Sequence, residues 1–279
     1  MQRVVIVHGI GHQYGGAAEL AASCAPALQD GMTRAGVADT PDIRCAFYGD
    51  VFRPPERTLG GEPSYDANDV EPGLEQELLM TWWEEAARTD PGVPPPDART
   101  LARTPRSVQT ALNALSGSTF FAGMAERLMV SNLRQVRRYL TDPELRQRAI
   151  ARVSAEIGPD TTVVVGHSLG SIVAYEALCA HAEARVAAFV TLGSPLGVRN
   201  LIFDRLIPTP GGWPGNVHSW TNVADEGDVV ALVKDLRPLF GENVRTVLVH
   251  NGSRAHDMTR YLTTEAVGRA IVEGLREAG

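Results

Sequence analysis

The chain has 279 residues, of which 44% are hydrophobic, and it carries 26 basic against 33 acidic side chains. This length and apolar content suit one large α/β domain or two small ones, and they exclude a disordered chain. The net charge of −7, without a basic face, argues against nucleic acid or an anionic membrane surface as a partner.

The N-terminal segment and the cysteines favour a cytoplasmic location. The apolar run at 4–7 is too short for a signal peptide, and no stretch approaches the roughly 18 apolar residues of a membrane span, so integral membrane association is not expected. Cys24, Cys45 and Cys179 are odd in number and lack metal-site spacing, so we interpret them as reduced thiols. A secreted protein whose signal has been removed is the alternative.

Short apolar runs alternate with helical segments along much of the chain. Six strands are predicted, at 4–7, 43–52, 162–165, 187–192, 217–223 and 245–250. Helical segments are predicted at 17–35, 73–88, 107–140 and 144–157. Alternating strands and helices with right-handed crossovers give a doubly wound, mainly parallel sheet with helices on both faces.

The middle of the chain interrupts this alternation. After the second strand the sequence becomes rich in Pro, Gly, Asp and Glu, and then shows helical spacing. We therefore predict a single domain over 1–279, in which 53–143 form a helical, cap-like insertion and 144–157 the crossover helix. Trp82 and Trp83 would either line a substrate pocket there or form the core of the helical layer.

The segment Gly166-His167-Ser168-Leu169-Gly170 lies between a predicted strand and a predicted helix. A serine hydroxyl presented from such a turn needs strained backbone, and side chains at the two glycine positions would collide with the neighbouring strand and helix. A helix that begins at the serine also points its positive dipole end at a developing negative charge. The alternative is a glycine-rich strand-to-helix turn without a catalytic role.

This segment resembles the nucleophile elbow of the α/β-hydrolases, particularly lipases, esterases and thioesterases. His8-Gly9-Ile10-Gly11-His12, after the first strand, resembles the oxyanion loop of the same family. The likeness covers the first 50 residues and those after 160. It implies an α/β-hydrolase fold with about six strands, reduced from the larger family sheet, which often has two more strands before this first one.

The resemblance also implies how the site is built. Backbone N–H groups of Ile10 and Leu169 would stabilise the oxyanion. The residues implied to contact substrate are His8, Gly9, His167 and Pro195. We expect no cofactor and no metal: the glycine loop lacks the Lys-Ser/Thr pair of a nucleotide site, and His8 and His12 have no nearby carboxylate.

A serine nucleophile needs a base and an acid, and the family order along the chain is Ser, Asp or Glu, then His. His256, in the loop after the last strand, is the expected base, with His250 as the alternative. Asp225 and Asp228 compete for the acid. We favour Asp228 because an Asp before Val-Val resembles the lipase pattern, which leaves Asp225 to form the turn.

The function predicted from the sequence is a serine hydrolase that cleaves a carboxylic ester or thioester, of a small molecule or a lipid, through an acyl-enzyme. Acyl transfer or peptide cleavage by the same triad is the second interpretation. A catalytically inactive hydrolase scaffold kept for binding is the third. The acyl chain length, the role of the insertion as a lid and the oligomeric state stay open.

Overall fold

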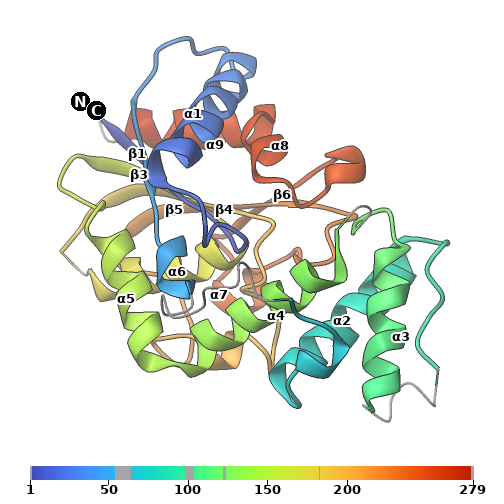
Figure 1. Cartoon of the computed structure of the whole chain (residues 1–279). Helices are drawn as coiled ribbons and strands as arrows, with labels where there is room; N and C mark the ends of the chain where they lie inside the picture. Colours follow the sequence, from blue (N-terminus) through green and yellow to red (C-terminus); the bar gives the residue numbers. More distant parts are fainter. Residues whose placement is uncertain (1, 54–63, 98–103, 122–123, 182, 278–279) are drawn as a thin grey trace.

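The computed structural model describes residues 2–53, 64–97, 104–121, 124–181 and 183–277 (Figure 1). The parts of the expected insertion at 54–63, 98–103 and 122–123 lie outside the described residues. The strands are β1 (Arg3–Val7), β2 (Asp42–Ala46), β3 (Thr161–His167), β4 (Val186–Leu192), β5 (Val217–Asp225) and β6 (Arg245–Val249). They form one six-stranded parallel sheet, in the order β2-β1-β3-β4-β5-β6, which confirms the predicted α/β class and the number of strands.

This strand order places a crevice between β1 and β3. The chain passes from β1 outward to β2, then returns to add β3 on the other side of β1. At such a switch point the loops leaving the two central strands diverge, and the carboxyl ends of the strands become a binding crevice. Val7 pairs in register with Gly166, so the loop after β1 and the turn after β3 begin side by side.

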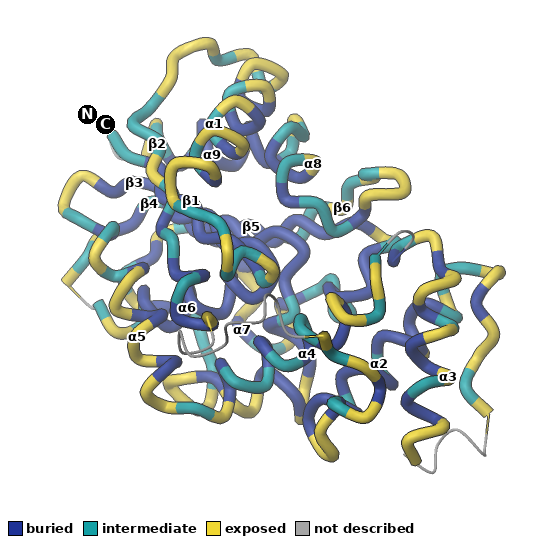
Figure 2. Tube along the Cα trace, viewed as in Figure 1, coloured by how far each residue is buried: buried dark blue, intermediate teal, exposed yellow. Residues whose placement is uncertain are grey.

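Helices cover both faces of the sheet (Figure 1). On one face lie α1 (Ala17–Arg34), α8 (Met258–Leu262) and α9 (Glu265–Glu277), and on the other lie α5 (Pro143–Ser154) and α6 (Leu169–Ala180). Alternate residues of a strand point to opposite faces: Val163 and Val165 join the cluster under α1 and α9, whereas Val164 joins the cluster under α5 and α6. Figure 2 shows the central strands fully buried between these layers.

The helices of the expected insertion are α2 (Leu74–Thr89), α3 (Pro105–Ser116) and α4 (Glu126–Thr141). They lie together on one side of the molecule (Figure 1). Their apolar faces belong to the same hydrophobic cluster as α5, α6 and one face of the sheet, with Trp83, Leu112 and Leu133 all buried in it. Exposed and buried residues alternate along α3, as Figure 2 shows.

Two predicted elements differ from the structure. The second strand was expected over 43–52 but ends at Ala46, and Gly49–Phe52 form a 3₁₀ helix. The chain turns there because the backbone N–H of Tyr48 donates to His8 Nε2 and not to a neighbouring strand. The helix expected over 107–140 is two helices, α3 and α4, because the carboxylate of Asp90 accepts hydrogen bonds from Thr119 and holds the chain in a turn between them.

A buried ion pair fastens the crossover helix α5 to α6, the helix that follows β3. The carboxylate of Glu176 on α6 accepts hydrogen bonds from Arg146 on α5, from the hydroxyl of Tyr139 on α4 at 2.6 Å and from the backbone N–H of Ile207 at 3.1 Å. Glu176 is 2% exposed and Arg146 7%. Removing one member of such a pair leaves an uncompensated buried charge.

We therefore predict that Arg146→Met lowers the free energy of unfolding by about 3–5 kcal/mol, measured by urea denaturation. The double variant Arg146→Met/Glu176→Leu should recover much of this loss, because it removes the stranded carboxylate. Arg269→Met provides the matched control, since its pair with Glu265 is exposed and should cost at most about 1 kcal/mol. Equal losses in Arg146→Met and Arg269→Met would contradict the prediction.

Candidate active site

The turn between β3 and α6 holds Ser168 in a strained conformation. Its φ and ψ are 53° and −130°, a region that side chains other than glycine rarely adopt. A Cβ at Gly166 would lie 2.6 Å from Ser171 Cα, and one at Gly170 would lie 2.1 Å from the carbonyl oxygen of His8. Both glycines are thus required by close backbone packing, as the sequence motif predicts.

Three loops bring a serine, a histidine and an aspartate into one hydrogen-bonded line. Ser168 Oγ lies 2.9 Å from Nε2 of His256, and Nδ1 of His256 lies 2.8 Å from Oδ2 of Asp228. Asp228 is fully buried and Ser168 is 3% exposed, while the side chain of His256 is 21% exposed. In this arrangement Nδ1–H donates to the carboxylate, and Nε2 can accept the proton of the serine hydroxyl.

Asp228 is held by four donors. One carboxylate oxygen accepts from His256 and from the hydroxyl of Tyr261 at 2.8 Å. The other accepts from the backbone N–H groups of Val230 at 2.9 Å and Ala231 at 3.3 Å. Burial alone would raise the pKa of Asp228, but the neighbouring His256 and these donors outweigh burial and lower it. The group is therefore ionised and fixed in direction.

Asp225 and His250, the alternatives for acid and base, lie elsewhere. The carboxylate of Asp225 accepts from the backbone N–H groups of Gly227, at 2.8 Å, and Asn251, so it shapes the turns after β5 and β6. His250 is exposed at the end of β6. Of the two aspartates and two histidines, the structure brings Asp228 and His256 together with Ser168.

The side chains of His167 and Tyr261 hold His256 and Asp228 in place. Nε2 of His167 donates to the backbone carbonyl of His256 at 2.8 Å, which anchors the loop after β6 to the turn after β3. The hydroxyl of Tyr261, on α8, accepts from the N–H of Asp225 at 2.8 Å and donates to Asp228. Burial raises the pKa of Tyr261, so its hydroxyl keeps its proton and remains a donor. The sequence contains no motif that would have singled out Tyr261.

The loop after β1 lies against the turn between β3 and α6. A Cβ on Gly9 would lie 2.9 Å from Ser168 Cβ. Nδ1 of His8 donates to the carbonyl of Gly9 at 2.6 Å, and because the peptide is trans, the N–H of Ile10 points the opposite way. The next N–H along, that of Gly11, donates to Oε1 of Gln135 at 3.2 Å.

Two backbone N–H groups therefore remain available at the site. Within the ranges that the structure describes, neither Ile10 N–H nor Leu169 N–H has an acceptor in the protein. Leu169 is the first residue of α6, where backbone N–H groups have no partner in the helix. These are the two donors expected to bind an oxyanion.

An apolar pocket opens beside Ser168. The expected substrate contact Pro195 lines it, together with Ile10 from the loop after β1 and Leu169 from α6. The insertion contributes Trp82, whereas Trp83 turns the other way and donates its indole N–H to the carbonyl of Pro94 at 2.7 Å.

Three of the four residues expected to contact substrate lie outside the lining of the apolar pocket. Within the described chain, that lining includes Pro195 but not His8, Gly9 or His167. Gly9 instead packs its backbone against Ser168. The ring of His8 is buried, stacks on Tyr48 with ring centroids 4.3 Å apart and bonds the Gly9 carbonyl. His167 lies beneath His256, as described above. Both side chains therefore support the backbone of the site from outside the pocket.

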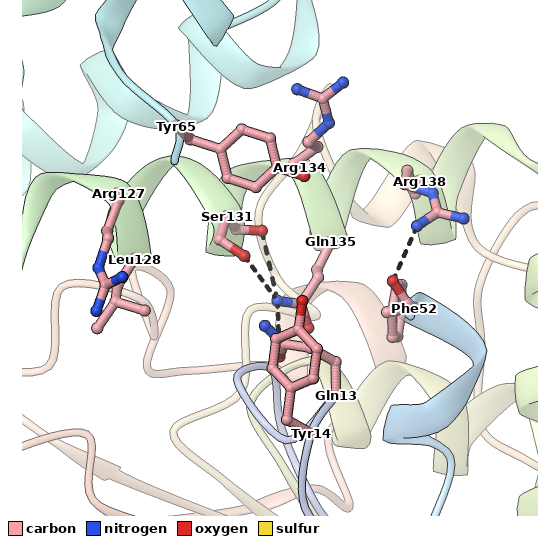
Figure 3. A pocket seen from close by; sticks show the side chains of 10 residues that line it. All are labelled: Gln13, Tyr14, Phe52, Tyr65, Arg127, Leu128, Ser131, Arg134, Gln135 and Arg138. Carbon is pink, nitrogen blue, oxygen red and sulfur yellow. Dashed lines mark hydrogen bonds between the residues drawn. The ribbon is translucent and has the colours of Figure 1, made fainter. Parts of the chain in front are cut away.

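A second, polar hollow lies between α4 and the loop after β1 (Figure 3). At its centre the amide of Gln135 donates to Gln13 Oε1 at 3.3 Å and to the backbone carbonyl of Ser131 at 3.4 Å. The guanidinium of Arg134 points away from this centre and lies over the ring of Tyr65 at 5.0 Å. Through these contacts, and through the bond from Gly11 N–H to Gln135, α4 holds the loop after β1.

Comparison with known proteins adds no relative. No protein-family model, no curated protein and no solved structure matches this chain. The interpretation of the site therefore rests on its own geometry.

Neither a metal-binding cluster nor a membrane-spanning helix is found among the described residues. Among them, no three His, Cys, Asp or Glu side chains converge as metal ligands would. None of the helices that the structure describes is both long enough and apolar enough to cross a membrane.

The buried histidines give the protein a defined pH dependence. Burial lowers the pKa of His8 and of His167 to about 3 in each case, with a neighbouring histidine adding to the effect. In the unfolded chain a histidine titrates near 6.5. Below that pH the unfolded state binds protons that the folded state does not bind, so acid favours unfolding.

We predict that the free energy of unfolding falls as pH is lowered from 6.5 towards 4.5, by up to about 1.4 kcal/mol per pH unit for each histidine. Urea denaturation at several pH values measures this slope. His8→Gln should make the slope shallower, and His218→Gln, whose side chain is 74% exposed, should leave it unchanged. A wild-type slope in His8→Gln would show that His8 is not kept neutral by the fold.

Proposed function

We propose that this chain is a serine hydrolase of the α/β-hydrolase fold, which cleaves a carboxylic ester or thioester through an acyl-enzyme. The observation that carries the proposal is the continuous line from Ser168 Oγ through His256 to the buried carboxylate of Asp228, at 2.9 and 2.8 Å. The three residues follow β3, β5 and β6 in the order Ser, Asp, His, which α/β-hydrolases share.

The geometry supports the following reaction. His256 Nε2 takes the proton from Ser168 as Oγ attacks the carbonyl carbon, and the N–H groups of Ile10 and Leu169 bind the oxyanion. The C–O or C–S bond to the leaving group then breaks, and the imidazolium returns the proton to the departing alcohol or thiol. In the second half, His256 takes a proton from water as the water oxygen attacks the acyl carbon. The bond from the acyl carbon to Ser168 Oγ then breaks, and the imidazolium returns the proton to Oγ, which releases the acid and restores the serine.

Each supporting group meets a requirement of this chemistry. A neutral serine hydroxyl is a weak nucleophile, and the adjacent imidazole overcomes this by accepting its proton. Asp228 fixes the ring and stabilises the positive charge that the ring acquires. Fixed backbone donors are already in place before charge develops, so little reorganisation is needed during the reaction. A binding protein without catalysis would have no need for this complete set.

We predict that a fluorophosphonate probe labels the native protein at Ser168, because only an activated serine reacts rapidly with it. Ser168→Ala should abolish labelling and ester hydrolysis while the protein stays folded by circular dichroism. Ser194→Ala is the matched control: Ser194 is also buried nearby, but its hydroxyl pairs with Ser171 at 2.7 Å, so labelling should persist. Labelling that survives Ser168→Ala would refute the proposal.

We also predict that the two aspartates separate in their effects. Asp228→Asn should reduce turnover at least about a hundredfold in a folded protein, since loss of this acid in serine proteases costs about 10⁴-fold. Asp225→Asn should keep turnover within about tenfold and mainly lower the melting temperature, because Asp225 bonds backbone N–H groups. Turnover of p-nitrophenyl acetate and thermal unfolding measure the two effects. The reverse pattern would transfer the acid's role to Asp225.

A further inference from the structure

The helical insertion supplies part of the wall of the apolar pocket beside Ser168. Leu78 and Trp82 of α2, four residues apart on one helix face, and Val136 of α4 belong to this part. The rest of the lining comes from the main fold, with Ile172 of α6 among its residues. Both α2 side chains are at least 96% buried, with Leu78 3% and Trp82 4% exposed.

Little room is left inside this pocket. The free space is about 20 Å³, comparable with the roughly 10–15 Å³ that one water requires. The lining is apolar apart from Ser168 itself, so a charged or polar acyl group would lose its hydration without gaining partners. The pocket therefore suits a small apolar group, and Trp82 is the largest side chain in its lining.

The helix that carries Trp82 is held on several sides. Glu75 on α2, fully buried, accepts from Arg137 on α4 at 2.5 Å, and Glu85 lies 3.7 Å from Lys234 in the segment after β5. Trp82 also packs on Phe121, with ring centroids 6.0 Å apart. Packed interiors resist the displacement of a large side chain. Trp82 therefore acts as a fixed wall in this structure.

We propose that this pocket is the acyl-binding site and that Trp82 restricts it to short apolar acyl groups. The inference rests on the proposed function, because it assigns the acyl part of the substrate of Ser168. It also gives the insertion a role, which is to set the depth of the acyl pocket. Acyl-chain selection would then depend on a residue outside the catalytic line.

Alkanesulfonyl fluorides of increasing chain length test this directly. They sulfonylate an activated serine and carry their alkyl group into the position of the acyl chain, whatever acceptor the natural reaction uses. Methane-, butane- and octanesulfonyl fluoride are compared by their rates of inactivation, each divided by the rate of hydrolysis of the reagent in buffer. For the wild-type protein we expect octanesulfonyl fluoride to react at least about tenfold more slowly than butanesulfonyl fluoride.

Trp82→Ala should raise the octane-to-butane ratio at least about tenfold. Trp83→Ala is the matched control, since it removes an equally large, equally buried side chain from the next position without opening the pocket. It should leave the ratio within about twofold while lowering the melting temperature. Val136→Ala, a smaller change in the same lining, should raise the ratio severalfold and serves if Trp82→Ala does not fold.

The outcomes separate the two proposals. Equal rates for the butane and octane reagents on the wild-type protein, or equal shifts in Trp82→Ala and Trp83→Ala, would overturn the role of Trp82 and leave the serine hydrolase standing. If no reagent inactivates the wild-type protein, methanesulfonyl fluoride included, and no probe labels Ser168, the proposed function fails and this inference fails with it.

Discussion

The close approach of two backbone segments at the centre of the sheet is the constraint on which the site depends. The loop after β1 lies on the turn after β3, so that a Cβ at Gly170 would lie 2.1 Å from the carbonyl oxygen of His8. Parallel pairing of β1 with β3 starts this contact, because both chains leave the sheet at the same edge. Without it, Ser168 and Ile10 would not line the same pocket.

Hydrogen bonds from surrounding side chains hold these two backbone segments, and the side chains that they carry, in fixed positions. Each is a side chain that bonds a neighbour's backbone or carboxylate: His8 orients the Gly9 carbonyl, His167 holds the carbonyl of His256, and Tyr261 joins the two aspartates. These groups are buried, where a hydrogen bond is strong and an unpaired polar atom is costly. The positions of the reacting groups are therefore set by residues that do not touch the apolar pocket.

Sequence reasoning succeeded where the determinants are local. The strand-turn-helix around Ser168 can be predicted from residues 162–178 alone because steric limits act between near neighbours, and the alternation of apolar runs predicted the six strands. It failed where the structure depends on contacts between residues that are far apart in the sequence. Nothing near Tyr48 shows that its N–H would bond His8 and end a strand. Helical spacing alone could not distinguish Trp82, which faces the pocket, from Trp83, and no motif surrounds Tyr261 or Gln135.

Consecutive residues of α4 serve the two halves of the site. Gln135 accepts the N–H of Gly11 and so holds the loop after β1, while Val136 lines the apolar pocket. A shift of α4 that widened the pocket would therefore also pull on this loop. In the proposed reaction the loop binds the developing charge, so substrate size and catalytic rate would be linked through the position of one helix. Shortening a pocket-lining side chain on α2 or α4 would widen the pocket without moving the loop.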